Sequence, residues 1–226
     1  AGEALPEQIA KRWKERYGID IYDGLGTTEM LHIYLTNKPG ATKYGTTGKP
    51  VPGYEIKLIG DDGMPVKPGD LGELYVRGPT SAIMYWNNRE KSRTTFQGEW
   101  TRSGDKYFQD EEGYYVCAGR QDDMLKVSGI YVSPFEVEAA LSSHPEVLEA
   151  AVVGWFDDER LVKPKAFVVL KLPDKASEEL ARALQDHVKQ LLAPYKYPRW
   201  IEFRAELPKT ATGKIQRFKL RAEDRA

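Results

Sequence analysis

The chain has 226 residues, enough for one large domain or two ordinary ones, and 41% of them are hydrophobic, which is compatible with a buried core. Its 33 basic and 34 acidic residues nearly cancel, so no net field attracts nucleic acid or an anionic membrane, and neither is expected as a partner. The single cysteine excludes an internal disulfide and a thiolate metal cluster. A cytoplasmic location is therefore the default expectation.

The N-terminal region predicts a helix, a strand and a loop in succession. The sequence opens without a methionine and runs at once into an amphipathic segment, which we interpret as a start inside a larger domain. Residues 6–16 carry apolar side chains at helical spacing, and Gly18 follows as a natural C-cap, so this segment predicts a helix. Residues 19–22 predict a short apolar strand that ends in the loop 23–29, a usual place for a ligand.

The rest of the chain divides into a β-rich part and a mixed part. Short strands at 55–59 and 72–77, separated by glycine-containing turns, predict a small β subdomain or barrel over about 43–116. The later elements are expected in this order: a strand pair at 124–132, a helix at 134–142, strands at 147–155 and 163–170, a helix at 177–192 and a closing strand. This order predicts a compact α+β module that is a plausible independent domain.

The first motif with chemical potential is Gly24-Leu25-Gly26-Thr27-Thr28-Glu29. Glycines let the backbone approach a ligand closely, hydroxyls can bond phosphate oxygens, and a carboxylate beside them can hold a hard cation such as Mg²⁺. The alternative is a glycine turn before a helix with Thr28 as its cap. The residues of this motif alone leave both interpretations open.

Three further motifs follow along the chain. In the segment 100–105, Asp105 follows a Ser-Gly turn and could accept hydrogen bonds from a ribose diol, although a plain turn explains this segment as well. The adjacent acids in 119–129 suit either a solvated linker or a hinge. In 208–214, Lys214 follows a flexible Thr-Gly loop and could reach a phosphate or carboxylate, or could belong to an exposed basic loop. Their order and spacing decide between these alternatives.

In this order, the four motifs resemble the adenylate-forming superfamily, which contains acyl-CoA synthetases, firefly luciferase and peptide-synthetase adenylation domains. Within it, the segments 2–6 and 26–33 look most like benzoate–CoA ligases, and relatives acting on hydroxybenzoates, furoate or other small aryl acids share much of this pattern. The resemblance implies a fold that combines α/β and α+β parts. Residues 1–120 would end a large adenylate-binding domain with its β-barrel-like subdomain, 121–123 would form a hinge, and 124–226 a small mobile lid domain.

The resemblance also implies a reaction. Enzymes of this superfamily join a carboxylate to ATP, giving an acyl-adenylate and pyrophosphate, and then transfer the acyl group to the thiol of coenzyme A. The implied partners are benzoate or a similar aryl acid, ATP, Mg²⁺, coenzyme A and the missing N-terminal part of the same polypeptide, and a homodimer is compatible with it. Thr28 would contact the adenylate phosphate, Glu29 would bind Mg²⁺, and Lys214 would bridge the acid and the nucleotide.

The remaining site residues are carried over in the same way. Asp105 would hold the ribose hydroxyls, Arg120 would assist at the ribose and phosphates, and Asp122 would be the hinge. The nucleotide site would further include Gly2, Glu3, Asp23, Gly24, Leu25, Gly26 and Thr27; the acyl pocket Gly26, His32, Ile33 and Lys126; and the thioester-forming site Lys126, Ser128 and Gly129. His32 could instead be an ordinary helix residue, and Lys126 a surface residue.

The sequence departs from the superfamily pattern at one point, and three alternative functions remain open. The glycine-, serine-, threonine- and lysine-containing loop that wraps the ATP phosphates in this superfamily does not occur in these residues, so we predict that the isolated chain does not adenylate benzoate. The substrate could be another aryl or medium-chain acid, or the acyl group could pass to a carrier protein. The chain could also be a nucleotide-binding interaction module, but retention of Glu29, Asp105, Arg120 and Lys214 argues against a scaffold.

Overall fold

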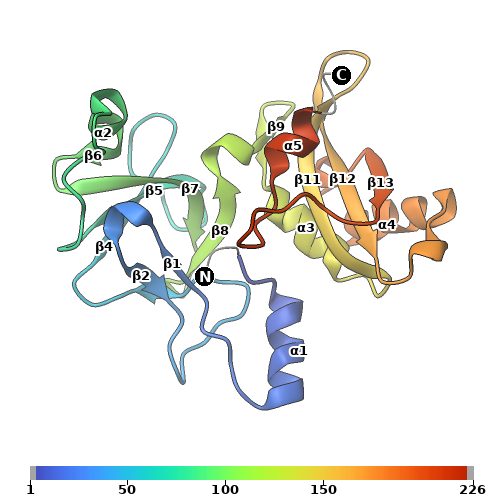
Figure 1. The fold of residues 1–226 in the computed structure, drawn as a ribbon, viewed down its shortest axis with the longest axis horizontal. Helices are drawn as coiled ribbons and strands as arrows, with labels where there is room; N and C mark the ends of the chain where they lie inside the picture. The colour runs from blue at the N-terminus through green and yellow to red at the C-terminus, as the bar shows by residue number, and fades with distance from the viewer. Residues whose placement is uncertain (1–3, 223–226) are drawn as a thin grey trace. The chain divides into compact units, whose positions relative to one another are not determined.

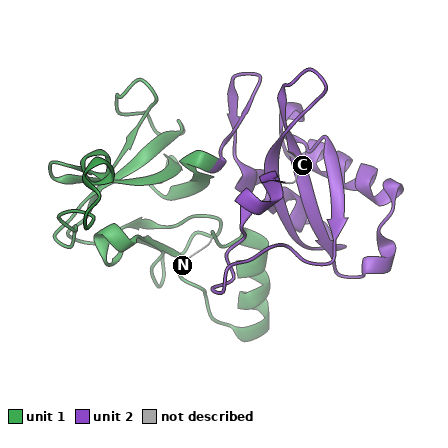
Figure 2. Cartoon of the chain, turned by 45° about the horizontal axis from the view of Figure 1, so that its top comes forward, with its two compact units in different colours: residues 1–122 green, residues 123–226 purple. Residues whose placement is uncertain are grey.

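The computed structural model describes residues 4–222, and the chain divides into two compact units, Ala1–Asp122 and Asp123–Ala226 (Figure 2). Helix α1 (Glu7–Tyr17) confirms the predicted helix, and Gly18 ends it in the left-handed conformation at φ 73°. The strand predicted at 19–22 is wrong. This segment does not pair with a described strand. Hydrogen bonds hold it in place instead, because the carboxylate of Asp20 accepts from Lys14 and Tyr44.

The first sheet of unit 1 is small and antiparallel, in the order β1-β2-β3. It contains β1 (Gly24–Gly26), β2 (Ile33–Thr36) and β3 (Lys49–Pro50), with the 3-10 turn η1 (Thr28–Met30) between β1 and β2. A side chain on Gly26 would place its Cβ 2.6 Å from the carbonyl oxygen of His32, and one on Gly24 would come 2.9 Å from that of Leu35. These glycines are therefore required by the close approach of the chain's own backbone.

The second sheet of unit 1 has the order β4-β5-β7-β6, with β8 paired to β7 (Figure 1). Its strands are β4 (Glu55–Ile59), β5 (Gly72–Arg77), β6 (Phe96–Gln97), β7 (Trp100–Gln109) and β8 (Tyr115–Arg120), and the helix α2 (Arg89–Thr95) lies between β5 and β6 in the chain. The strands predicted at 55–59 and 72–77 are confirmed. A plain turn at 100–105 is wrong, because these residues belong to β7, and Gly104 at φ 77° lies where the ladder is irregular.

Unit 2 contains all the elements predicted after residue 123. The predicted elements are β9 (Leu125–Val127), β10 (Ile130–Val132), α3 (Pro134–Ser142), β11 (Val147–Phe156), β12 (Val162–Leu170), α4 (Glu178–Leu191) and β13 (Trp200–Arg204), after the turn η2 (Gln121–Asp123) at the junction. The short turns η3 (Pro173–Lys175) and η4 (Pro194–Lys196) and the helix α5 (Arg217–Ala222) were not predicted. Ser133 and Ser177 cap α3 and α4 by accepting hydrogen bonds from backbone N–H groups. None of the helices within 4–222 has the length and apolar character that a membrane crossing requires.

The central sheet of unit 2, β11-β12-β13, is covered on both faces (Figure 1). Strands β12 and β13 are parallel and are connected through α4. Val152 and Val168 belong to the apolar cluster that includes α3 and α4, whereas Val153 and Phe167 belong to a second cluster with Leu207 and Leu220. Burial on both faces explains why β11 and β12 have nearly continuous apolar runs in place of strict alternation.

A buried ion pair attaches the last helix to the rest of unit 2. Arg217 is 7% exposed, and its Nη2 lies 2.8 and 2.9 Å from the two carboxylate oxygens of Glu138. Glu138 also accepts a hydrogen bond from the backbone N–H of Val152 at 2.7 Å. The pair thereby joins α5 to α3 and β11, and it lies directly after the loop that contains Lys214.

Replacing Arg217 by alanine is expected to lower the free energy of unfolding by about 3–5 kcal/mol, because Glu138 would keep a buried charge without its ionic partner. Arg182→Ala is the matched control: Arg182 pairs with Glu178 in α4, but their side chains are 72% and 86% exposed. The control should cost less than about 0.5 kcal/mol. Urea unfolding of both variants measures this difference, and equal losses would contradict the role given to the buried pair.

Candidate active site

The loop between β1 and β2 presents two of the predicted site residues on a fixed base. Met30 in the turn η1 is fully buried and belongs to the apolar core of unit 1. Thr28 beside it is exposed, and Glu29 is half-buried. The anchored Met30 therefore holds a hydroxyl and a carboxylate at the surface of unit 1. The alternative in which Thr28 caps a helix is wrong, because Thr27 occupies the cap position and its side chain makes no capping hydrogen bond.

The carboxylate of Glu29 accepts a hydrogen bond from the hydroxyl of Tyr85. Partial burial by itself would raise the pKa of Glu29, but the hydrogen bond from Tyr85, smaller hydrogen-bond contributions and the charge of Lys91 together outweigh it. The pKa consequently lies below its ordinary value. Glu29 is thus held as a carboxylate at neutral pH, the form that binds a hard cation.

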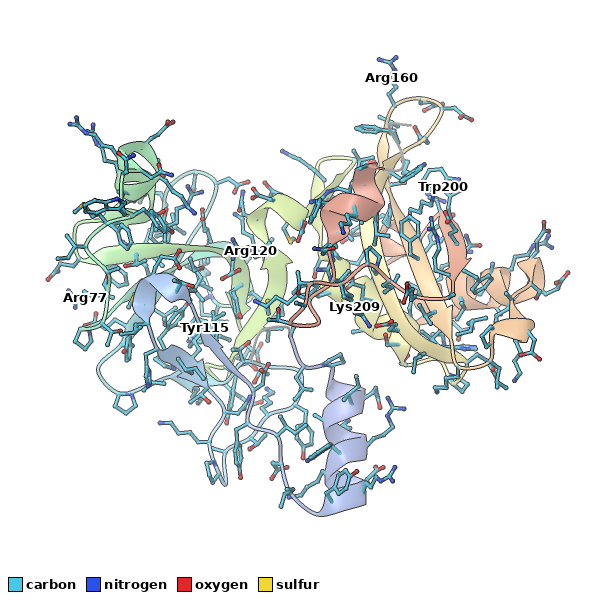
Figure 3. The ribbon with its side chains drawn as sticks, viewed as in Figure 1. Arg77, Tyr115, Arg120, Arg160, Trp200 and Lys209 are labelled. Carbon is cyan, nitrogen blue, oxygen red and sulfur yellow. The ribbon has the colours of Figure 1, made fainter. Side chains whose placement is uncertain are left out.

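Asp105 and Arg120 form the second polar group of unit 1. They are paired across β7 and β8, and Nη1 of Arg120, the residue labelled in Figure 3, lies 3.2 Å from Oδ1 of Asp105. Asp105 is 7% exposed, whereas the Arg120 side chain is 57% exposed. Burial raises the pKa of Asp105, and the charge of Arg120 offsets only part of that rise. The pair combines a buried acceptor with an exposed cation.

Two buried hydroxyls lie among these charged groups. Among the described residues, the hydroxyls of Thr27 and Tyr34 make no hydrogen bond of standard geometry, but Thr27 and Ser103 lie near enough to the Tyr34 hydroxyl to lower its pKa by hydrogen bonding. Burial and the charge of Asp105 are the two largest causes that raise the pKa of Tyr34, and the charge of Glu29 adds to them. The two hydroxyls therefore add uncharged polar groups to the charged groups of unit 1.

Other predicted residues of the loop have structural partners. Both carboxylate oxygens of buried Asp23 accept backbone hydrogen bonds, from Gly24 at 2.9 Å and from Leu5 at 3.4 Å. Gly2 and Glu3 lie outside the described residues. His32 precedes β2 and is not in a helix, so its alternative as a helix residue is wrong. Its ring is exposed and stacks on Tyr54, with the ring centroids 6.1 Å apart.

In unit 2, the residues predicted for the thioester step lie on the hairpin of β9 and β10. Lys126 is exposed and pairs across the hairpin with Tyr131. Ser128 and Gly129 form the turn, at φ 49° and 84°, and both are exposed. A two-residue turn with both residues at positive φ requires small or permissive residues, so the turn geometry explains them without a ligand.

Lys214 lies in an exposed turn that is held at its base. The backbone N–H of Thr210 donates to the Lys214 carbonyl at 2.8 Å, and the Thr210 hydroxyl accepts from the Lys214 N–H at 3.0 Å. Gly213 adopts φ 86°. Lys209, which Figure 3 labels, pairs with Glu149 at 2.6 Å. The Lys214 side chain makes no ion pair with any described residue. A positive charge is therefore available to an incoming anion.

No cluster of three or more histidine, cysteine, aspartate or glutamate side chains within 4–222 could hold a metal ion by itself. Glu29 and Thr28 supply hard oxygen atoms, which suit Mg²⁺ when most of its other ligands are phosphate oxygens and water. The donor set thus fits a cation that arrives with a nucleotide.

Two family models and several known proteins match this chain. The family described as "AMP-binding enzyme" matches residues 1–86, and "AMP-binding enzyme C-terminal domain" matches residues 136–214. Benzoate–CoA ligase from Thauera aromatica is 66% identical over 98% of this chain and 42% of its own length. The 4-hydroxybenzoate–CoA/benzoate–CoA ligase from Rhodopseudomonas palustris is 54% identical over 98% of this chain and 41% of its own length.

Solved structures of aryl acid–CoA ligases are also similar to this chain. An anthranilate–CoA ligase in complex with anthranoyl-AMP has a TM-score of 0.95 and 57% identity, over 98% of this chain and 43% of that chain. A benzoate–CoA ligase from Burkholderia xenovorans has a TM-score of 0.92 and 61% identity, over 97% and 44%.

The mixed α/β fold is that of the adenylate-forming enzymes, as the sequence predicted. The chain belongs to the AMP-binding enzyme family, and its predicted resemblance to benzoate–CoA ligases is confirmed. It spans about two fifths of the length of these relatives.

Sequence reasoning did not find Tyr85 or Tyr34. Tyr85 lies in an apolar run whose neighbours Ile83 and Trp86 are 90% and 91% exposed, so no periodicity marks it as a site residue. Tyr34 reads as an ordinary apolar residue of a strand. Only folding brings the Tyr85 hydroxyl to the carboxylate of Glu29 and the Tyr34 hydroxyl near that of Asp105. No local sequence pattern predicts these long-range neighbours.

Asp105→Asn is expected to remove a pH dependence of unfolding. The folded pKa of Asp105 is raised above 3.8, so between these two values the folded chain binds more protons than the unfolded chain, and stability falls as pH rises. Urea unfolding at a series of pH values measures this fall, which the variant should lack. Arg120→Gln should extend the fall to higher pH, because the charge of Arg120 lowers the pKa of Asp105. An identical pH profile in the parent and Asp105→Asn would contradict the account.

Proposed function

We propose that this chain is part of an aryl acid–CoA ligase that converts benzoate, ATP and coenzyme A into benzoyl-CoA, AMP and pyrophosphate. The observation that carries the proposal is the 66% identity to a benzoate–CoA ligase over nearly the whole chain. Retention of Glu29, Asp105, Arg120 and Lys214 supports it. Together these residues supply the anionic, cationic and hydrogen-bonding groups that the two half-reactions require.

In the proposed adenylation step, unit 1 holds the nucleotide. The buried carboxylate of Asp105 accepts hydrogen bonds from the ribose hydroxyls, and exposed Arg120 contacts the ribose and phosphates. The hydroxyl of Thr28 bonds the phosphate that receives the acid, and Asp23 with residues 24–27 shapes the adjoining loop. Glu29 would hold Mg²⁺, which would neutralise negative charge on the phosphates when bound.

Lys214 brings the two anions together. A carboxylate oxygen of benzoate attacks the α-phosphorus of ATP, an oxygen–phosphorus bond forms, and pyrophosphate leaves. The carboxylate and the phosphate repel each other in water, so an ammonium group at their junction stabilises the developing transition state. The exposed, unpaired side chain of Lys214 suits this role.

The second half-reaction releases AMP. The thiol of coenzyme A attacks the acyl carbonyl carbon, a carbon–sulfur bond forms, the bond to the phosphate oxygen breaks, and the thiol proton passes to solvent. We assign Gly26, His32 and Ile33 to the acyl pocket, with Lys126 approaching the bound acid. Ser128 and Gly129 would flank the path of the pantetheine arm, since small residues leave room for a narrow chain.

The domain organisation is part of the same proposal. We assign residues 1–120 to the end of the large adenylate-binding domain, 121–123 to the hinge and 124–226 to the lid. The boundary between the two compact units, between Asp122 and Asp123, falls inside the assigned hinge and supports this assignment. Asp122 is exposed in a short turn, which suits a residue whose backbone must change conformation.

The product distinguishes this proposal from transfer to a carrier protein. The full product of the gene should be incubated with benzoate, ATP and Mg²⁺, together with either coenzyme A or a phosphopantetheinylated carrier protein. Benzoyl-CoA detected by mass spectrometry is the expected product. Acylation of the carrier without formation of acyl-CoA would contradict the proposal, and so would nucleotide binding without any benzoate-dependent turnover.

Lys214→Ala in the full gene product is expected to slow benzoate adenylation about 100-fold or more, because it removes a charge that acts in the transition state. It should spare formation of benzoyl-CoA from supplied benzoyl-adenylate. Lys219→Ala, an exposed lysine of the same unit, is the matched control and should leave both rates unchanged. Equal loss of both half-reactions in Lys214→Ala would show that the role assigned to Lys214 is wrong.

A further inference from the structure

The segment before α2 is fastened to the Glu29 turn at three points. The backbone N–H of Ala82 donates to the Glu29 carbonyl at 2.7 Å, and the Thr80 hydroxyl donates to the Met30 carbonyl. The hydroxyl of Tyr85 then donates to the Glu29 side chain. Two of these bonds fix the backbone of the turn, so the third acts on a carboxylate whose attachment point is already held.

Tyr85 is itself held from the side of α2. Its backbone N–H donates to the Ser92 hydroxyl at 2.9 Å, and its ring packs on Phe96 with the centroids 5.4 Å apart. The ammonium group of Lys91 lies over the ring, 4.3 Å from its centroid. The hydroxyl therefore comes from a side chain with little freedom to move, which a contact needs in order to orient a neighbour.

We propose that Tyr85 is a positioning residue that orients the Glu29 carboxylate toward the divalent cation of the bound nucleotide. This inference rests on the proposed function, in which Glu29 is the metal ligand. Tyr85 donates to Oε1 of Glu29, and the proposal assigns the other oxygen, Oε2, to the cation. A fixed donor on the first oxygen restricts rotation of the carboxylate, and loss of such a partner behind a metal ligand typically costs about 10–100-fold in metal affinity or activity.

A purely structural role for the same contact makes a different prediction. If Tyr85 only joined two segments, removing its hydroxyl would lower the free energy of unfolding and leave metal binding unchanged. Tyr85→Phe separates the two roles, because it keeps the ring against Phe96 and removes only the hydroxyl. Tyr114→Phe is the matched control: it removes a tyrosine hydroxyl of the same unit, which donates to the Ala41 carbonyl at 3.0 Å and has no contact with Glu29.

The experiment uses the full product of the gene with Mn²⁺ and a non-hydrolysable ATP analogue. Free Mn²⁺ is measured by electron paramagnetic resonance, and the Mg²⁺ concentration that gives half-maximal benzoate adenylation is measured in parallel. Tyr85→Phe is expected to weaken Mn²⁺ binding about 10-fold and to raise the Mg²⁺ requirement similarly, with the KM for benzoate unchanged. Tyr114→Phe is expected to leave both metal measurements unchanged.

Unchanged Mn²⁺ affinity in Tyr85→Phe would overturn the proposal, and tighter binding would overturn it too, because the hydroxyl would then compete with the cation. Glu29→Gln separates this failure from failure of the proposed function. If Glu29→Gln loses Mn²⁺ affinity and Tyr85→Phe does not, only the role of Tyr85 is wrong. If Glu29→Gln also keeps full affinity, Glu29 is not the metal ligand and the proposed site itself is wrong.

Discussion

The groups proposed for adenylate formation are divided between two compact units, and the rest of the account depends on this division. The polar site with Glu29 and Asp105 lies in unit 1, and Lys214 lies in unit 2. Each unit must therefore hold its own groups in place. In unit 1, Tyr85 holds Glu29 and Arg120 pairs with Asp105. In unit 2, the buried pair of Arg217 and Glu138 holds the chain directly after the Lys214 turn. Such independence is what the proposed hinge requires.

The electrostatics of the site differ from those of the structural contacts. Asp105 is buried although burial raises its pKa, so folding keeps a carboxylate in a position that costs stability. Lys214 is exposed and has no ionic partner among the described residues. Arg217, in contrast, is fully engaged by Glu138. A buried carboxylate such as Asp105, or an unpaired lysine such as Lys214, is typical of a ligand-binding site. The paired charge of Arg217, in contrast, stabilises the fold.

The sequence predicted local structure well where a local signal exists. Ser133 and Pro134 mark the start of α3, and the predicted range 134–142 is confirmed to the residue. The strand predicted at 19–22 is wrong because a strand also needs a neighbour, and the turn at 100–105 is wrong because one bulged glycine resembles a turn. The contacts of Tyr85 with Glu29 and of Arg217 with Glu138 span 56 and 79 residues. No local pattern encodes such pairs. The site residues themselves came from the family resemblance, and their roles remain predictions.

Carboxylate-dependent exchange between ATP and pyrophosphate tests the central claim most directly, because it reports formation of the acyl-adenylate alone. The full product of the gene should be measured with benzoate, hydroxybenzoates, other small aryl acids and medium-chain fatty acids. The account predicts exchange with benzoate or a close aryl relative and little with fatty acids. Absence of exchange with every acid would contradict the assignment of an adenylate-forming ligase, and exchange with fatty acids alone would contradict the aryl substrate.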